Sequence, residues 1–135
     1  MYLSDVCKNK IVSYLRKEFN PEFIYLFGSF AKGEGRDDSD IDLAIYTEEV
    51  ISPYTLFKVA NHLAFEVKRD VQIVHLKDVS TVFAAQIVGT GEVLYCENEE
   101  QMANYNIRTF KEYAKLNEER QIIWDAIERD GKIYA

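Results

Sequence analysis

Residues 28–42 of the chain read GSFAKGEGRDDSDID, and the interpretation of the whole sequence starts from this stretch. It follows a short apolar and aromatic run, residues 23–27, and its last two residues begin a second apolar run, residues 41–46. Runs of this length and composition are typical of buried strands, whereas glycine-rich, charged residues are typical of loops. The stretch therefore predicts a strand, a long loop and a second strand.

Acidic residues crowd the second half of this stretch, with five carboxylates against a single arginine. Crowded carboxylates repel one another and tend to bind protons unless a cation neutralises them. Asp40 and Asp42 are two residues apart at the head of the second predicted strand, so their side chains should leave the same face of the sheet. Asp70 opens a later predicted strand and would join them if the two strands are neighbours. Three converging carboxylates suit Mg²⁺, which takes its other ligands from water and substrate phosphates.

Gly28 and Ser29 provide a complementary feature at the start of the loop. A glycine at the end of a strand lets the backbone approach a ligand closely, and the following amide and hydroxyl can donate hydrogen bonds to phosphate oxygens. Arg36 and Lys32 are further candidates for contacts with phosphate. We therefore expect a metal site on one side of the loop and an anion site on the other.

Each of these residues also has a purely structural interpretation. A solvated strand face explains Asp40 and Asp42 poorly, because the rest of their strand is apolar. Asp70 can be a simple boundary residue between a helix and a strand. Turn formation or packing is the ordinary role of six others: Gly28, Asp37, Asp38, Ser39, His62 and His75.

Helices and strands are expected to alternate along the chain. Apolar periodicity and cap residues predict helices over 4–19, 52–67, 79–88 and 98–129, and strands over 23–27, 41–46, 70–76 and 93–96. Gly89 and Gly91 are expected to end the third helix. This pattern predicts an α/β (α+β) fold in which helices flank a small mixed sheet.

The chain length of 135 residues indicates a single domain, residues 1–135. We divide it into an α/β core over 1–97 and a helical segment over 98–135. A sheet of three or four strands can cover only part of so long a C-terminal helix. The segment is therefore the expected contact surface for a partner.

Composition excludes several classes of protein. A net charge of -7 argues against stable nucleic-acid binding, which depends on Lys and Arg. No apolar run is long enough to span a bilayer and the first residues do not resemble a signal peptide, so no membrane association and a cytoplasmic location are expected. Two cysteines and two histidines without a Cys-x-x-Cys pair make a zinc site improbable.

The order of motifs resembles a known superfamily. Gly28-Ser29, ten intervening residues, Asp40-x-Asp42 and a later aspartate are similar to the signature of the nucleotidyltransferases that include DNA polymerase β and kanamycin nucleotidyltransferase. The short chain and the loop ending in Ser-Asp-Ile-Asp-Leu resemble the minimal nucleotidyltransferases. They resemble in particular the MntA-type antitoxins of HEPN/MNT toxin–antitoxin pairs.

The resemblance implies a nucleotidyltransferase fold and a site of defined roles. Gly28 and Ser29, with Arg36, would hold the phosphates of ATP, and Asp40, Asp42 and Asp70 would bind two Mg²⁺ ions. Asp70 would also be the general base, because it stands apart from the close pair. The expected reaction is transfer of AMP to a hydroxyl, that of a tyrosine, on a cognate HEPN ribonuclease toxin, which neutralises the toxin.

Two other functions remain open at this point. The chain can be a non-catalytic antitoxin that binds its partner through the C-terminal helix. It can also be a nucleotidyltransferase that acts on a small molecule of the aminoglycoside kind. The first alternative needs neither Mg²⁺ nor ATP, and the second needs a roomy acidic pocket but no protein partner.

Overall fold

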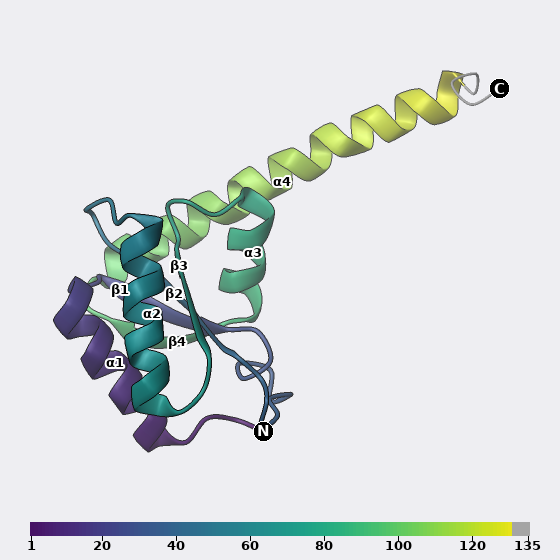
Figure 1. Ribbon diagram of the computed structural model, residues 1–135. Coiled ribbons are helices and arrows are strands. Elements are labelled where there is room, and N and C mark those ends of the chain that lie inside the picture. Colours follow the sequence, from purple (N-terminus) through teal and green to yellow (C-terminus); the bar gives the residue numbers. More distant parts are fainter. Residues whose placement is uncertain (131–135) are drawn as a thin grey trace.

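Four strands form one mixed sheet in the order β3-β2-β1-β4 (Figure 1). β1 pairs antiparallel with both β2 and β4, whereas β2 and β3 run parallel. The computed structural model describes residues 1–130, which contain four helices and the four strands, with β1 and β2 consecutive. The elements are α1 (Asp5–Phe19), β1 (Phe23–Phe27), β2 (Ile41–Tyr46), α2 (Pro53–Val67), β3 (Val71–His75), α3 (Thr81–Thr90), β4 (Glu92–Cys96) and α4 (Glu99–Asp130). The expected α/β order and mixed sheet are confirmed.

Serine caps set the starts of three helices. The hydroxyls of Ser4, Ser52 and Ser80 each accept a hydrogen bond from the backbone N–H three residues later, at 3.1 to 3.2 Å. The first two caps were expected. α3 begins two residues later than predicted, because its cap is Ser80 and the apolar residue Val79 lies before it.

The end of α3 also differs from the prediction. Gly89 does not take the positive φ that often ends a helix, and it lies inside α3, which continues past it to Thr90. Gly91 is the C-cap, and its N–H donates to the carbonyl of Ile87 at 2.8 Å. Glu92 then begins β4 one residue earlier than expected.

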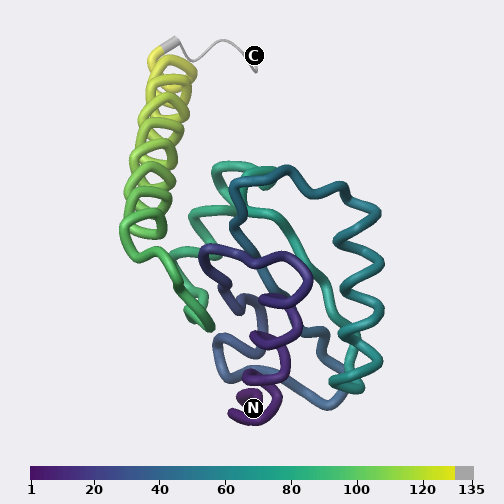
Figure 2. The backbone as a smooth tube through the Cα atoms, turned by 90° about the vertical axis from the view of Figure 1, so that its left-hand side faces the viewer, coloured from purple at the N-terminus to yellow at the C-terminus, as the bar shows by residue number. Residues whose placement is uncertain are grey.

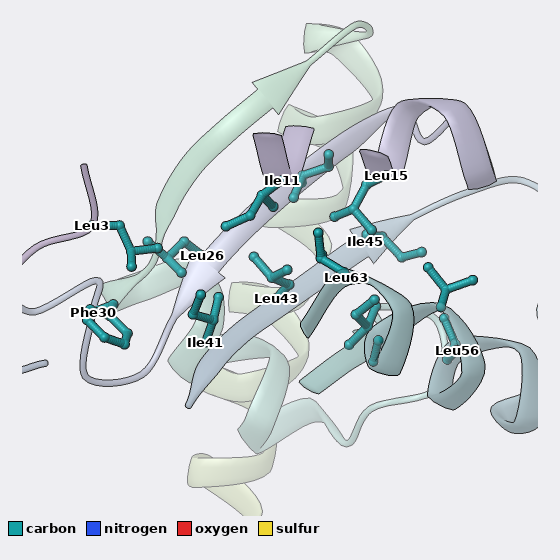
Figure 3. Packing of buried hydrophobic residues seen from close by; sticks show 14 residues of the cluster. Leu3, Ile11, Leu15, Leu26, Phe30, Ile41, Leu43, Ile45, Leu56 and Leu63 are labelled. Atoms are coloured by element: carbon teal, nitrogen blue, oxygen red, sulfur yellow. The ribbon is translucent and has the colours of Figure 1, made fainter. Parts of the chain in front are cut away.

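The two faces of the sheet carry separate apolar clusters. α1 and α2 cover one face, where Ile11, Leu15 and Leu63 pack on alternate residues of β1, β2 and β3 (Figure 3). α3 and the start of α4 cover the other face, which is rich in aromatic residues such as Phe23 and Tyr46. Asp42 alternates with the residues of the first face and therefore belongs to the second.

α4 lies against the sheet only with its first turns. The Tyr105 hydroxyl donates to the carbonyl of Leu76 at 2.7 Å, and it anchors the helix beside the end of β3. Beyond this anchor the helix leaves the body of the molecule (Figures 1 and 2). Ile122, Ile123 and Trp124 are there 68%, 59% and 58% exposed. This confirms that the sheet covers the helical segment only in part; residues 131–135 of that segment lie outside the described residues.

Within residues 1–130, no helix has both the length and the apolar character that a membrane crossing requires.

Candidate active site

The predicted Gly-Ser bend lies directly beside Asp42. β1 and β2 pair so that Phe27 is opposite Asp42, and Gly28 follows with a positive φ of 75°. A methyl group added to Gly28 would collide with the Asp42 carboxylate. Glycine is required here both for the left-handed backbone conformation and for the space. The strand end, the bend and the first aspartate of the sheet thus meet at one point.

Ser29 begins a compact turn with free donors. Its carbonyl accepts hydrogen bonds from the N–H groups of Lys32 and Glu34, at 3.2 and 2.9 Å, and the carbonyl of Gly28 accepts one from Ala31 at 3.2 Å. The amide and the hydroxyl of Ser29 make no hydrogen bond to other residues in the range 1–130. Both groups remain available to an anionic ligand at this turn.

Asp40 and Asp42 form an acidic pair without a counter-charge. Burial raises the pKa of the Asp42 carboxyl, and the nearby Asp40 carboxylate raises it further. Neither side chain has an ion pair or a hydrogen-bond donor among the described residues. Two partly exposed carboxylates beside a free anion-binding turn fit Mg²⁺, which uses one or two protein carboxylates and completes its shell with phosphates and water.

Asp70 lies at the same end of the sheet as Asp40 and Asp42, but its hydrogen bond to β2 is made by its backbone carbonyl. β3 begins at Val71, one residue later than predicted, and the carbonyl of Asp70 accepts a hydrogen bond from the Ile41 N–H at 2.8 Å. The Asp70 side chain is exposed. Residues 1–130 contain no group of three acidic, histidine or cysteine side chains arranged to hold a metal ion. The structure therefore brings Asp40 and Asp42 together but does not add the Asp70 carboxylate, whose role stays a prediction.

Gln72 is a neighbour of the acidic pair that sequence reasoning missed. In the parallel pairing of β2 and β3, Gln72 is the partner of Asp42. Directly paired residues project from the same face of a sheet, so the Gln72 side chain is on the face of Asp42. The alternation Asp70, Gln72 was visible in the sequence, but only the register decides which of the two pairs with Asp42.

The two predicted basic residues of the loop are exposed. Arg36 is held by its backbone, because its N–H donates to the Ser39 hydroxyl at 2.8 Å. Ser39 therefore stabilises a turn, as its structural interpretation predicted. The side chains of Arg36 and Lys32 make no hydrogen bond or ion pair with the acidic pair, and their proposed contacts with phosphate stay predictions.

Known proteins are similar to this chain in both sequence and fold. The family model "Polymerase beta, Nucleotidyltransferase" matches residues 9–100. The protein adenylyltransferase MntA of Shewanella oneidensis (strain MR-1) is 32% identical over 121 residues, which are 89% of this chain and 86% of the relative.

Solved toxin–antitoxin complexes contain similar chains. A toxin–antitoxin crystal structure with AMP-PNP has a chain with a TM-score of 0.81 and 32% identity, covering 90% of this chain and 98% of its own. A complex of tri-AMPylated Shewanella oneidensis HEPN toxin with MNT antitoxin has one with a TM-score of 0.77 and 29% identity, covering 93% and 99%. Together with the bend at Gly28 and the acidic pair, these matches place the chain in the polymerase β nucleotidyltransferase family.

Proposed function

We propose that the chain is a Mg²⁺-dependent protein adenylyltransferase that transfers AMP from ATP to a tyrosine hydroxyl of a cognate HEPN toxin and so neutralises it. The observation that carries the proposal is the position of the acidic pair, Asp40 and Asp42, beside the free donors of the Gly28-Ser29 bend. The relatives are described as an adenylyltransferase and as an antitoxin bound to an AMPylated toxin, which supports this reaction over other nucleotidyl transfers. We expect the reaction to take place in the cytoplasm.

The bend and the acidic pair have complementary tasks in this reaction. Ser29 donates to the phosphates of ATP, with Gly28 allowing their close approach and Arg36 adding charge. The tyrosine oxygen attacks the α-phosphorus, its proton passes to a base, and the bond to the pyrophosphate oxygen breaks. Asp40 and Asp42 would hold two Mg²⁺ ions, whose charge would favour deprotonation of the attacking hydroxyl and stabilise the leaving pyrophosphate.

Asp70 remains our candidate for the base and for an additional metal ligand. Its carboxylate is exposed at the start of the strand that neighbours Asp42, and it is not committed to any ion pair within residues 1–130. A base must reach the hydroxyl proton in the complex, and catalytic contacts often tighten only when substrate is bound.

A binding antitoxin is the second candidate function. The exposed apolar residues on the distal half of α4 support it, because such a patch is typical of a protein contact. Binding and transfer are compatible, and they separate on whether neutralisation needs Mg²⁺ and ATP.

A small-molecule acceptor has less support. A cavity of about 1050 Å³ with many carboxylates in its lining exists, but it lies at the opposite end of the sheet, beside Glu22 and Thr47. Gly28, Asp40 and Asp42 are not part of its lining. A substrate bound there would be remote from the acidic pair.

An intact-mass measurement of the toxin tests the proposed AMP transfer. The purified HEPN toxin is mixed with this chain and MgATP, and its intact mass is measured. We expect added adenylate with the native chain and none when Asp40 and Asp42 are both replaced by Ala. An unchanged mass with the native chain, or a labelled toxin with the double variant, contradicts the proposal.

A further inference from the structure

Arg69 joins the active-site loop to the connection between α2 and β3. Its Nη1 donates to the carbonyl oxygens of Arg36 and Asp37, at 3.0 and 2.9 Å. Its guanidinium carbon also lies 4.9 Å from the centroid of the Phe30 ring, which is buried. One side chain from outside the loop therefore contacts the loop at three residues.

These contacts converge on the turn that leads into Asp40. The Arg36 carbonyl that Arg69 binds also accepts a hydrogen bond from the Ser39 N–H at 3.1 Å, and the Arg36 N–H is bound by the Ser39 hydroxyl. Residues 36–39 are thus a closed turn, and Arg69 fixes its position relative to the sheet. Asp40 follows directly after it.

Asp42 is held in a different way. It lies in β2, paired on one side with β1 and on the other with β3, so the ladders of the sheet fix its backbone. Loss of Arg69 would leave this aspartate in place but would release the turn before Asp40. The separation of the two carboxylates would then vary.

The contact has one requirement that arginine meets and lysine does not. Nη1 alone donates to both carbonyls, while the planar face of the guanidinium lies over the aromatic ring. The ammonium of lysine is a compact point charge that can donate to carbonyls but has no planar face to stack. The Arg69 guanidinium binds carbonyls and has no ion pair with a carboxylate among residues 1–130. Its effect on the acidic pair is therefore one of geometry.

We propose that Arg69 is a positioning residue that holds Asp40 at a fixed distance from Asp42 and so sets the affinity of the pair for a divalent cation. The identity of the reaction rests on the proposed function, whereas the effect on cation binding does not. Groups that orient metal ligands typically change metal affinity by about 10- to 100-fold when they are removed.

The test compares Arg69→Gln and Arg69→Lys with a matched control, Arg16→Gln. Arg16 also stacks on an aromatic ring, 4.6 Å from the centroid of Tyr95, but makes no contact with the loop. Amide hydrogen exchange is measured on the free proteins, and Mn²⁺ binding is measured by electron paramagnetic resonance with and without AMP-PNP. Neither measurement depends on turnover.

We expect Arg69→Gln to speed exchange selectively in residues 33–41 and to weaken Mn²⁺ binding about tenfold or more. Arg69→Lys should be intermediate, and Arg16→Gln should behave as the native chain. In the transfer reaction, Arg69→Gln should raise the Mg²⁺ concentration needed for half-maximal rate more than it lowers the rate at saturating Mg²⁺.

Native exchange and native Mn²⁺ affinity in Arg69→Gln would overturn the inference. If that variant loses protection across the whole sheet, Arg69→Lys decides, and it must then show the selective effect on the loop. A native chain that binds Mn²⁺ but never labels the toxin refutes the proposed function and leaves the role of Arg69 standing. Labelling that is normal in Arg69→Gln at low Mg²⁺ refutes the role of Arg69 alone.

Discussion

The polar residues at the two ends of β2 differ in whether they have partners. At the C-terminal end, far from the acidic pair, Thr47 is 5% exposed, and its hydroxyl lies 2.8 Å from Nε2 of His75, which is 2% exposed. The Thr47 hydroxyl donates to the carbonyl of Glu49, and the Lys77 N–H donates to Nδ1 of His75. Nδ1 is thus an acceptor, so Nε2 carries the proton and donates to Thr47. Every polar group in this network has a partner.

At the near end, Asp40 and Asp42 have no such partners. Their charges repel, and burial adds to the unfavourable energy of the Asp42 carboxylate. A buried polar group that is satisfied stabilises the fold, whereas one left without a counter-charge in a folded protein indicates a ligand. The comparison separates the satisfied Thr47–His75 network, which we call the structural end of the strand, from the unpaired acidic pair. Beside that network, the buried Oε2 of Glu22 also has no hydrogen-bond partner among residues 1–130.

The largest effect should follow from removal of both carboxylates. Asp40→Ala with Asp42→Ala is expected to lower AMP transfer at least about a thousandfold, because the cation that neutralises the transferred phosphate is no longer held. Transfer is measured from radiolabelled ATP with the HEPN toxin as acceptor. The double variant must fold, which its circular dichroism checks, and substantial residual labelling would refute the functional assignment of this end.

Gly28→Ala should disturb the nucleotide site beside the acidic pair without removing a charge. The new Cβ atom would displace the Asp42 carboxylate, and the left-handed φ would add strain of about 1–2 kcal/mol. We expect weaker binding of AMP-PNP, measured by calorimetry, and a lower free energy of unfolding. Gly89→Ala is the control, since no atom lies near the position of its Cβ. Native binding by Gly28→Ala would show that the bend does not hold the nucleotide.

Thr47→Val tests the structural end. The substitution leaves the buried Nε2–H of His75 without an acceptor and should lower the free energy of unfolding by about 1–3 kcal/mol in chemical denaturation. Transfer per folded molecule should remain native. A strong loss of activity at unchanged stability would contradict the division between the two ends.

The pH dependence of stability should report His75. Burial lowers the pKa of His75, so below its unfolded value of about 6.5 the unfolded chain binds more protons than the folded one. The stabilisation is fully present above pH 6.5 and is lost as the pH falls from 6.5 through the lower pKa of the folded state, with a slope of at most about 1.4 kcal/mol per pH unit for one proton. Urea titrations between pH 8 and 5 measure it. His75→Gln should reduce the slope, and the exposed His62→Gln should not.

The smallest effect is expected for Asp42→Asn in the absence of metal. The pKa of Asp42 is raised on folding, so the folded state favours the neutral form and the charge at pH 7 lowers stability. Removal of the charge should increase the free energy of unfolding by roughly 0.5 kcal/mol after allowance for solvent screening. Added Mg²⁺ with AMP-PNP should stabilise the native chain and not this variant. Destabilisation by Asp42→Asn without metal would indicate a structural role for Asp42.

Local signals were enough to predict most of the fold. Ser4 and Ser52 predicted helix starts because a serine hydroxyl at the N-cap accepts a hydrogen bond from a free backbone N–H of the first turn, which is a local interaction. The loop between β1 and β2 followed from Gly28 and the acidic residues. The start of α3 was misplaced because the apolar run begins before the cap. Gly89 was misread as an end because a glycine can also lie within a helix without a positive φ, and the sequence does not show which conformation it takes.

The site was only partly predictable for a related reason. Asp40 and Asp42 flank Ile41, the first residue of β2, so a spacing of two residues was sufficient to place them together. The position of Asp70 depended on the pairing of two strands that are far apart in sequence. These strands are neighbours, as the prediction required, and their register pairs Gln72 with Asp42 and places Asp70 directly before Val71, the partner of Ile41. Arg69 carried no local signal, because its partners are backbone carbonyls, which every residue has.

Asp40 and Asp42 stand on opposite sides of the boundary between a loop and a strand. A cation that binds both must therefore link the loop to the rigid centre of the protein, in addition to the link that Arg69 makes. Saturation with the ion should then reduce the mobility of residues as distant as Gly33, and proteases that cleave this loop should act more slowly.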